Sequence, residues 1–186
     1  MTKRYLLLFC LGLLLAVPLA FIPTNDPRDV IYVASPPAVV DKMLELAEIR
    51  PGDVVYDLGC GDGRIPVAAA KKYGVRAFGF DIDPERVRES LDNVEKNGVG
   101  DLVTIEQANV FELDLSGASV IMLYMGRQLN AKLIPQLEKL KPGSRIVSHD
   151  FDMPGVKPRK VVSVHPDNDR ERLIYLWITP LEKEKE

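Results

Sequence analysis

The sequence predicts an α/β fold, in which a mostly parallel sheet ends in an antiparallel hairpin and carries helices on both faces. Between residues 38 and 148, short apolar runs rich in β-forming residues alternate with stretches of helical periodicity. Such alternation favours a parallel sheet that is covered on both faces. Two more β-forming runs then follow each other around the polar loop 166–171, which indicates a closing hairpin.

Start and stop signals delimit four amphipathic stretches. Pro36-Pro37 precede the first stretch, where apolar residues recur at helical spacing, and Pro51-Gly52 follow it. Gly74 stops the second helix, while Pro84 begins the third and Asn97-Gly98 end it. The expected helices are residues 38–49, 63–73, 84–97 and 129–140.

The β-forming runs lie between these helices and after the last of them. The run DVVYDL at residues 53–58 is largely apolar, as is typical of a strand buried on both faces. The expected strands are residues 53–58, 76–80, 102–106, 118–124, 144–148, 160–165 and 173–179. In such sheets a ligand binds at the carboxyl ends of the strands, so polar residues that follow the strands form the candidate site.

The chain has two compositionally different parts. Residues 1–24 contain only Lys3 and Arg4 as charged side chains, whereas residues 25–186 hold 22 basic and 27 acidic residues, a net charge of −5. A mildly acidic domain argues against general nucleic-acid binding, which needs a basic face. The two cysteines lie in an apolar run and in a glycine-rich turn, so they do not form a disulfide framework.

The uncharged stretch Tyr5 to Ile22 predicts a hydrophobic N-terminal segment, residues 1–24, ahead of a domain at residues 25–186. As a helix this stretch is about 27 Å long, close to the ~30 Å of a bilayer core, so we expect a single membrane span through residues 5–22. The alternative is a cleaved signal peptide with its cut after Ala20, although Pro18 fits poorly at such a site.

A glycine-rich turn after the first strand is the strongest functional motif. Asp57 ends the strand and is followed by Leu58-Gly59-Cys60-Gly61-Asp62-Gly63. Glycines at alternate positions let the backbone turn tightly and let a ligand approach closely, because no Cβ is in the way. The third glycine comes one residue too early for a dinucleotide fingerprint. The extra carboxylate also suits a cationic or amino-bearing ligand better than a pyrophosphate.

Two further strand ends carry candidate nucleotide-binding residues. Asp81 ends the second strand, where a carboxylate accepts hydrogen bonds from ribose hydroxyls, and Ile82 beside it is a second candidate. Asp83 is interpreted as the cap of the next helix. After the third strand, Asn109 and Val110 form a polar–apolar pair that can bond to and pack against an adenine ring. The alternative is a turn in which Asn109 bonds locally.

Together these motifs resemble the class I S-adenosylmethionine-dependent methyltransferases over residues 36–180. The sequence from Asp57 to Gly63 matches the glycine motif of that family, and Asp81 matches its ribose-binding acid. The resemblance implies a Rossmann-like sheet of seven strands and S-adenosyl-L-methionine as the cofactor. It also implies backbone contacts from Gly59 and Gly61 to the methionine part of the cofactor. The link between the fifth and sixth strands is too short for the helix that is usual there.

The segment before the first helix carries a narrower resemblance. Residues 30–36 (VIYVASP), residues 39–44 (VVDKML) and the glycine turn look like the small membrane-associated protein-lysine methyltransferases. That group includes the mitochondrial enzymes that act on the ATP synthase c subunit and on the adenine nucleotide translocase. Its members commonly read Tyr-Val-Pro-Thr-Pro, where this chain reads YVASP. We expect Tyr32 and Ser35 to close over the cofactor, and the alternative is simple packing of this segment.

Candidates for catalytic groups lie at the ends of the fourth and fifth strands. Tyr124 can orient an amine through its hydroxyl or its ring face, or else pack at the strand end. Asp150 and Asp152 can bind an ammonium group or accept its proton through water, or else cap the loop. We expect His149 to be a structural residue and His165 to be a hairpin residue.

We therefore expect an S-adenosylmethionine-dependent methyltransferase that transfers a methyl group in line to a protein lysine, with no nucleic-acid partner and no metal. The alternatives are a small or lipid-soluble acceptor and a protein that binds the cofactor without turnover. Lys3 and Arg4 flank the apolar run more closely than Arg28 does, which favours a domain outside the cytoplasm. This conflicts with a cofactor expected inside, so the side of the membrane stays open, as does the oligomeric state.

Overall fold

The computed structural model describes residues 32–166 and 170–184. The predicted membrane span at residues 5–22 therefore lies outside the described residues, as do the first two residues of the VIYVASP motif. Among the helices of the described part, none is long and apolar enough to cross a membrane.

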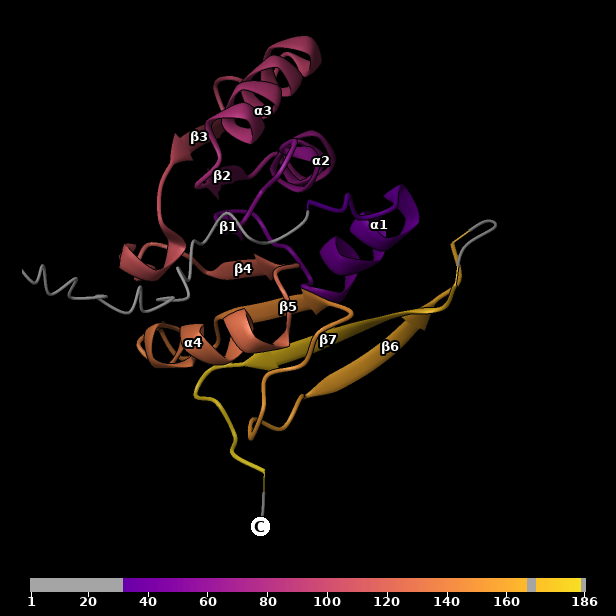
Figure 1. Ribbon diagram of the computed structural model, residues 1–186, viewed down its shortest axis with the longest axis vertical. Coiled ribbons are helices and arrows are strands. Elements are labelled where there is room, and N and C mark those ends of the chain that lie inside the picture. Colours follow the sequence, from indigo (N-terminus) through magenta and orange to yellow (C-terminus); the bar gives the residue numbers. More distant parts are fainter. Residues whose placement is uncertain (1–31, 167–169, 185–186) are drawn as a thin grey trace, which may run out of the picture.

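Seven strands form a single sheet at the centre of the molecule (Figure 1). They are β1 (Val54–Leu58), β2 (Arg76–Asp81), β3 (Val103–Gln107), β4 (Val120–Leu123), β5 (Arg145–His149), β6 (Lys160–Val164) and β7 (Arg172–Ile178). Their order in the sheet is β3-β2-β1-β4-β5-β7-β6. The first five strands pair in parallel, whereas β7 runs antiparallel to both β5 and β6. The predicted fold class is confirmed.

Each predicted helix is present, and the described residues also contain a short 3-10 helix that the sequence analysis does not predict. The helices are α1 (Pro37–Leu46), α2 (Arg64–Tyr73), α3 (Pro84–Asn97), α4 (Arg127–Leu137) and the 3-10 helix η2 (Val110–Glu112). The chain between β5 and β6 forms turns and no helix, as the shortness of this link predicts.

Local signals explain where these helices end. Gly74 and Gly98 follow α2 and α3 with φ angles of +65° and +64°, the left-handed conformation that glycine adopts easily. The Asp83 side chain accepts a hydrogen bond from the backbone N–H of Glu85 at 2.8 Å, so the prediction of a helix cap is confirmed. The end of α4 differs from the prediction, because residues 138–140 tighten into a turn with i→i+3 hydrogen bonds.

The sheet separates two hydrophobic clusters. On one face, α1, α2 and α3 pack against the sheet, and on the other face α4 and η2 do so. Val120 and Met122 of β4 belong to the first cluster, while Ile121 and Leu123 belong to the second. All four side chains are fully buried, which explains why this strand has no polar position. Trp177 of β7 is also buried and belongs to the second cluster.

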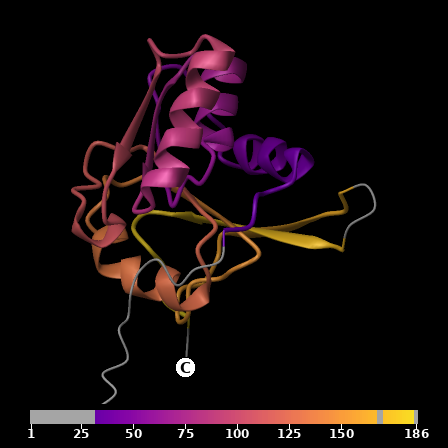
Figure 2. The same ribbon diagram turned by 45° about the horizontal axis from the view of Figure 1, so that its top comes forward.

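The order of the strands fixes where a ligand can bind. From β1 the chain proceeds to β2 and β3 on one side, and β4 then pairs with β1 on the other side. The carboxyl ends of β1 and β4 therefore diverge into loops that leave a crevice between them, as in other doubly wound sheets. The carboxyl end of β6 and the amino end of β7 project from the body of the molecule on the opposite side from α4 and η2 (Figure 2).

Candidate functional site

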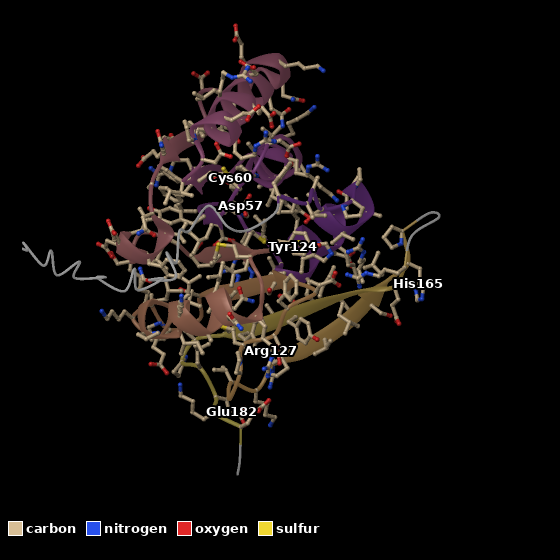
Figure 3. All side chains as sticks on the ribbon, in the orientation of Figure 1. Asp57, Cys60, Tyr124, Arg127, His165 and Glu182 are labelled. Carbon is tan, nitrogen blue, oxygen red and sulfur yellow. The ribbon has the colours of Figure 1, made fainter. Side chains whose placement is uncertain are left out.

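A cavity of about 700 Å³ opens at the carboxyl ends of β1, β2 and β4, where the strand order reverses. It brings together most of the residues singled out in the sequence. Its wall includes Tyr32, Ser35, Asp57, Gly59, Asp81, Ile82, Asn109, Val110 and Tyr124. Asp57 and Tyr124 lie near the middle of the molecule, whereas His165 lies far out on the hairpin (Figure 3).

The glycine turn is held in place by the end of β2. The backbone N–H groups of Gly59 and Cys60 donate to the carbonyl oxygen of Phe80 at 2.8 and 3.0 Å. The N–H of Gly61 donates to Asp81 Oδ2 at 2.9 Å, and Oδ1 of the same carboxylate accepts from the N–H of Asp83 at 3.0 Å. Asp81 therefore shapes the turn, besides facing the cavity. Gly61 itself does not line the cavity wall described here.

Asp57 is a buried carboxylate without a compensating cation in the described part of the chain. The residue is only 2% exposed, and its Oδ2 has no hydrogen-bond partner among the described residues. Burial, together with the nearby carboxylates of Asp81 and Asp62, raises the pKa of Asp57 well above its ordinary value. An unpartnered acceptor in a cluster of acids fits a ligand that brings hydrogen-bond donors and positive charge. The ammonium group of S-adenosyl-L-methionine has both properties, and its sulfonium group adds positive charge.

Residues 32–35, the leading segment, are attached to the rim of the cavity at several points. Arg64 donates from Nη1 to the carbonyl oxygen of Ser35 at 2.8 Å and also pairs with Asp62, so it acts as a structural hydrogen-bond donor. The guanidinium group of Arg86 lies 4.9 Å from the centre of the Tyr32 ring. Partial burial and the charge of Asp62 raise the pKa of Tyr32. The leading segment is thereby fixed beside the glycine turn.

Gly61→Ala is expected to displace Tyr32 and to destabilise the protein. A Cβ at this position would lie 2.2 Å from Cε2 of Tyr32, and the φ of +58° is itself unfavourable for alanine. We expect a loss of about 2–3 kcal/mol in the free energy of unfolding, measured by urea denaturation. Gly98→Ala is the matched control, because its φ is +64° but no atom lies within 4 Å of the added Cβ. Equal losses for the two variants would refute the predicted clash.

Asn109 lines the cavity but makes local hydrogen bonds. Its Oδ1 accepts from the N–H of Phe111 at 3.2 Å, and its Nδ2 donates to Glu112 Oε1 at 2.8 Å. These bonds form the turn that the sequence offers as the alternative, and they begin η2. Val110 beside it is buried in the cluster under α4. Contact of this pair with an adenine ring stays a prediction.

Tyr124 is held firmly at the end of β4. Its ring stacks on His149 with centroids 3.8 Å apart and an angle of 25° between the planes, and Phe151 stacks at 5.7 Å. Nη1 of Arg172 lies 3.5 Å from the Tyr124 hydroxyl oxygen. With these contacts in place, Tyr124 forms part of the cavity wall. His149 is fully buried behind it, whereas the side chain of His165 is 71% exposed on the hairpin.

Asp150 and Asp152, the predicted catalytic acids, do not line the cavity. Oδ2 of Asp150 accepts from Arg170 and, at 3.0 Å, from Arg172. Burial alone would raise the pKa of Asp150, but the hydrogen bond from Arg172 and its other partners hold the pKa below the ordinary value. Asp152 is bonded to Arg127 at 2.6 Å. Both carboxylates are thus engaged by arginines, and a direct catalytic role for either stays a prediction.

Several contacts that shape the site have no local signal in the sequence. Ser35 Oγ lies 2.9 Å from Nδ1 of His149, although 114 positions separate the two residues. Arg86 and Arg172 come from α3 and β7 to contact Tyr32 and Tyr124. Residue type and spacing do not indicate such pairs, because they depend on which loops meet at the edge of the sheet.

Comparison with known proteins identifies the family. The model of the ANTKMT methyltransferase domain matches residues 57–160, more than half of the chain. A protein-lysine N-methyltransferase from Saccharolobus islandicus is 46% identical over 149 residues, which are 79% of this chain and 92% of that protein. A ribosomal protein L11 methyltransferase from Pelotomaculum thermopropionicum is 34% identical over 101 residues, but this chain covers only 33% of that relative.

A solved structure agrees with this result. The crystal structure of an RNA methyltransferase from Salinibacter ruber, in complex with S-adenosyl-L-homocysteine, is 42% identical. The two folds superpose with a TM-score of 0.75 over 83% of this chain and 98% of that chain. The chain therefore belongs to the ANTKMT methyltransferase domain family, and it is an S-adenosyl-L-methionine-dependent methyltransferase.

Proposed function

We propose that this methyltransferase acts on the side-chain amine of a protein lysine. The observation that carries the proposal is the 46% identity, over 92% of its length, to a relative named protein-lysine N-methyltransferase. The aromatic wall at Tyr124 supports it, since a ring face or hydroxyl can orient an amine beside the cofactor. The bound cofactor supplies an electrophilic methyl group, and the protein mainly aligns the acceptor with it.

We assign the cofactor to the part of the cavity around the glycine turn. Asp57 would accept a hydrogen bond from a cationic group, and Asp81 would bind the ribose hydroxyls. Gly59 and Gly61 would contact the methionine part, while Ile82, Asn109 and Val110 would surround the adenine. Tyr32 and Ser35 would cover the cofactor. The position of all but Gly61 in one cavity wall supports this assignment.

An RNA acceptor is the second candidate, because the 42% identical solved structure is named an RNA methyltransferase. The charge of this chain favours the protein acceptor. Residues 25–186 carry a net charge of −5, and the cavity wall holds four aspartates beside four basic residues, so it is not a basic surface. RNA binding instead gains most of its affinity from basic residues that contact phosphates.

A labelling experiment separates these acceptors. The full-length protein is incubated with cell extract and S-adenosylmethionine that carries a radioactive methyl group. The radioactivity is counted in the protein, RNA and lipid fractions, and the methylated residue is identified by mass spectrometry. We expect the labelled macromolecules to be degraded by protease and to resist RNase. We expect the label to be recovered as methyllysine. Label in RNA or in the lipid extract would refute the lysine acceptor. Cofactor binding without any transfer would point to a binding protein instead of a transferase.

We also propose that residues 5–22 attach the domain to a membrane. The support is their length of 18 residues without a charge. We expect the full-length protein to stay in the membrane fraction after carbonate extraction, whereas a variant beginning at residue 25 should be released. Protease protection of intact spheroplasts then reports the side of the membrane. Release of the full-length protein by carbonate would contradict the span.

A further inference from the structure

Ser35 connects the cavity to the buried imidazole of His149. Ser35 lines the cavity, and its Oγ lies 2.9 Å from Nδ1 of His149. Ser35 is 4% exposed and His149 is fully buried. The imidazole is therefore shielded from solvent, and the Ser35 hydroxyl links it to the cavity wall.

The opposite side of the imidazole faces a carboxylate. Nε2 of His149 lies 3.5 Å from Oδ2 of Asp150. With the proton on Nε2, the side that faces Asp150, Nδ1 can accept a hydrogen bond from the Ser35 hydroxyl. Asp150 adopts a φ of +59°, an uncommon backbone conformation for a residue other than glycine. Such conformations are common at functional sites. Here the residue with this backbone conformation, Asp150, is the one whose carboxylate faces the imidazole.

The same imidazole also supports the acceptor side of the cavity. Tyr124 stacks on His149, and Ser35 lies at hydrogen-bond distance from it, so these two residues of the cavity wall contact the same imidazole. An amine oriented by Tyr124 would thus lie near the Ser35 hydroxyl. In the described part of the chain, the charged groups near His149 include Asp150, directly after β5, and Arg170 and Arg172, which both bond to Asp150.

We propose that Ser35 and His149 form a proton relay that deprotonates the acceptor ammonium, an inference that rests on the proposed lysine acceptor. A lysine side chain is protonated near neutral pH and has no lone pair for the methyl group until a proton leaves. In the relay, the ammonium N–H bond breaks and its proton passes to Ser35 Oγ. The hydroxyl proton of Ser35 passes at the same time to Nδ1 of His149, which becomes an imidazolium.

The relay gives each residue a separate task. Ser35 regains its hydroxyl in the same step, so no net charge is left on it. The negative charge of Asp150, 3.5 Å from Nε2, offsets the positive charge of the imidazolium. Asp150 is then a positioning residue that acts through His149. This explains why its carboxylate faces away from the cavity. The relay proton returns to solvent after the methylated amine has left.

The test compares His149→Asn and Ser35→Ala with the wild type in transfer to a lysine peptide from pH 7 to pH 10. We expect turnover at pH 7 to fall by about 100-fold, because general base catalysis typically contributes 10²–10⁴-fold. The deficit should shrink to less than about tenfold at pH 10, where solution hydroxide deprotonates the lysine. For His149→Asn, whose imidazole does not line the cavity, affinity for S-adenosylmethionine measured by calorimetry should change by less than about threefold.

Controls separate the relay from a structural contact and from the acceptor itself. His165→Asn removes an exposed histidine and should behave as the wild type at every pH. Ser35→Thr keeps a hydroxyl and should recover most of the turnover that Ser35→Ala loses; this pair decides the question even when His149→Asn does not fold. A deficit that is constant with pH, or a loss of cofactor affinity that accounts for it, overturns the relay alone. A wild type that labels no lysine overturns both the proposed function and the relay.

Discussion

Asp81→Ala is expected to weaken the binding of S-adenosylmethionine by about 100-fold or more, the largest effect that we predict. In our assignment the variant loses hydrogen bonds from two ribose hydroxyls to a charged acceptor, which are worth about 1.5–3 kcal/mol each. It also loses the bond at 2.9 Å that holds the N–H of Gly61 in the glycine turn. Isothermal titration calorimetry on the purified protein measures the change directly.

Two variants make this result specific. Asp92→Ala removes an exposed carboxylate of α3 that pairs only weakly with Arg88, and it should bind the cofactor as the wild type does. Asp81→Asn keeps one oxygen acceptor at the site and should lie between the wild type and Asp81→Ala. An affinity of Asp81→Ala within threefold of the wild type would show that the ribose does not bind here.

Asp57→Asn is expected to change stability and binding in opposite directions. Burial and neighbouring carboxylates raise the pKa of Asp57 in the folded protein, so the folded state holds a proton that the unfolded chain releases. The cofactor-free protein therefore loses stability as the pH rises from the unfolded value of about 3.9 toward the raised value. At pH 8 the neutral amide should raise the free energy of unfolding by about 1–3 kcal/mol.

The same substitution should weaken cofactor binding. A cationic ligand favours the ionised carboxylate, so the affinity of the wild type should rise with pH through the raised pKa of Asp57 and binding should release a proton. Calorimetry in buffers of different ionisation enthalpy measures that proton, and Asp57→Asn should release none. Asp101→Asn, an exposed residue after α3, is the control. Proton release that survives Asp57→Asn would assign it to another group.

The elements of the fold follow from local signals, which explains why the sequence predicts them. A short, fully apolar run such as β4 is typical of a strand covered on both faces, and a glycine after a helical pattern, as at 74 and 98, is typical of a helix end. The acids at 57 and 81 could be placed because strand ends in a parallel sheet share one edge. Nothing in these arguments needs a contact between distant loops.

The acceptor side of the site could not be predicted in the same way. The direction of the Asp150 side chain depends on a φ of +59°, which no neighbouring residue indicates. Its arginine partners are Arg170, just before β7, and Arg172, the first residue of β7, about twenty positions further along the chain. The contact of Ser35 with His149 depends on the packing of the leading segment against the end of β5. The direction of a side chain at a strand end thus depends on tertiary contacts, even when the local sequence is enough to predict the strand.

Under the proposed membrane span, the attachment of the leading segment to the rim of the cavity would limit the distance of the site from the membrane. Tyr32 lies in the cavity wall, ten positions after Ile22, the end of the proposed membrane span. Ten residues extend at most about 33–36 Å. An anchored enzyme of this kind searches a thin layer along the bilayer surface, so its encounters with acceptors are two-dimensional. Lysines in loops close to the membrane would then be met at a high local concentration.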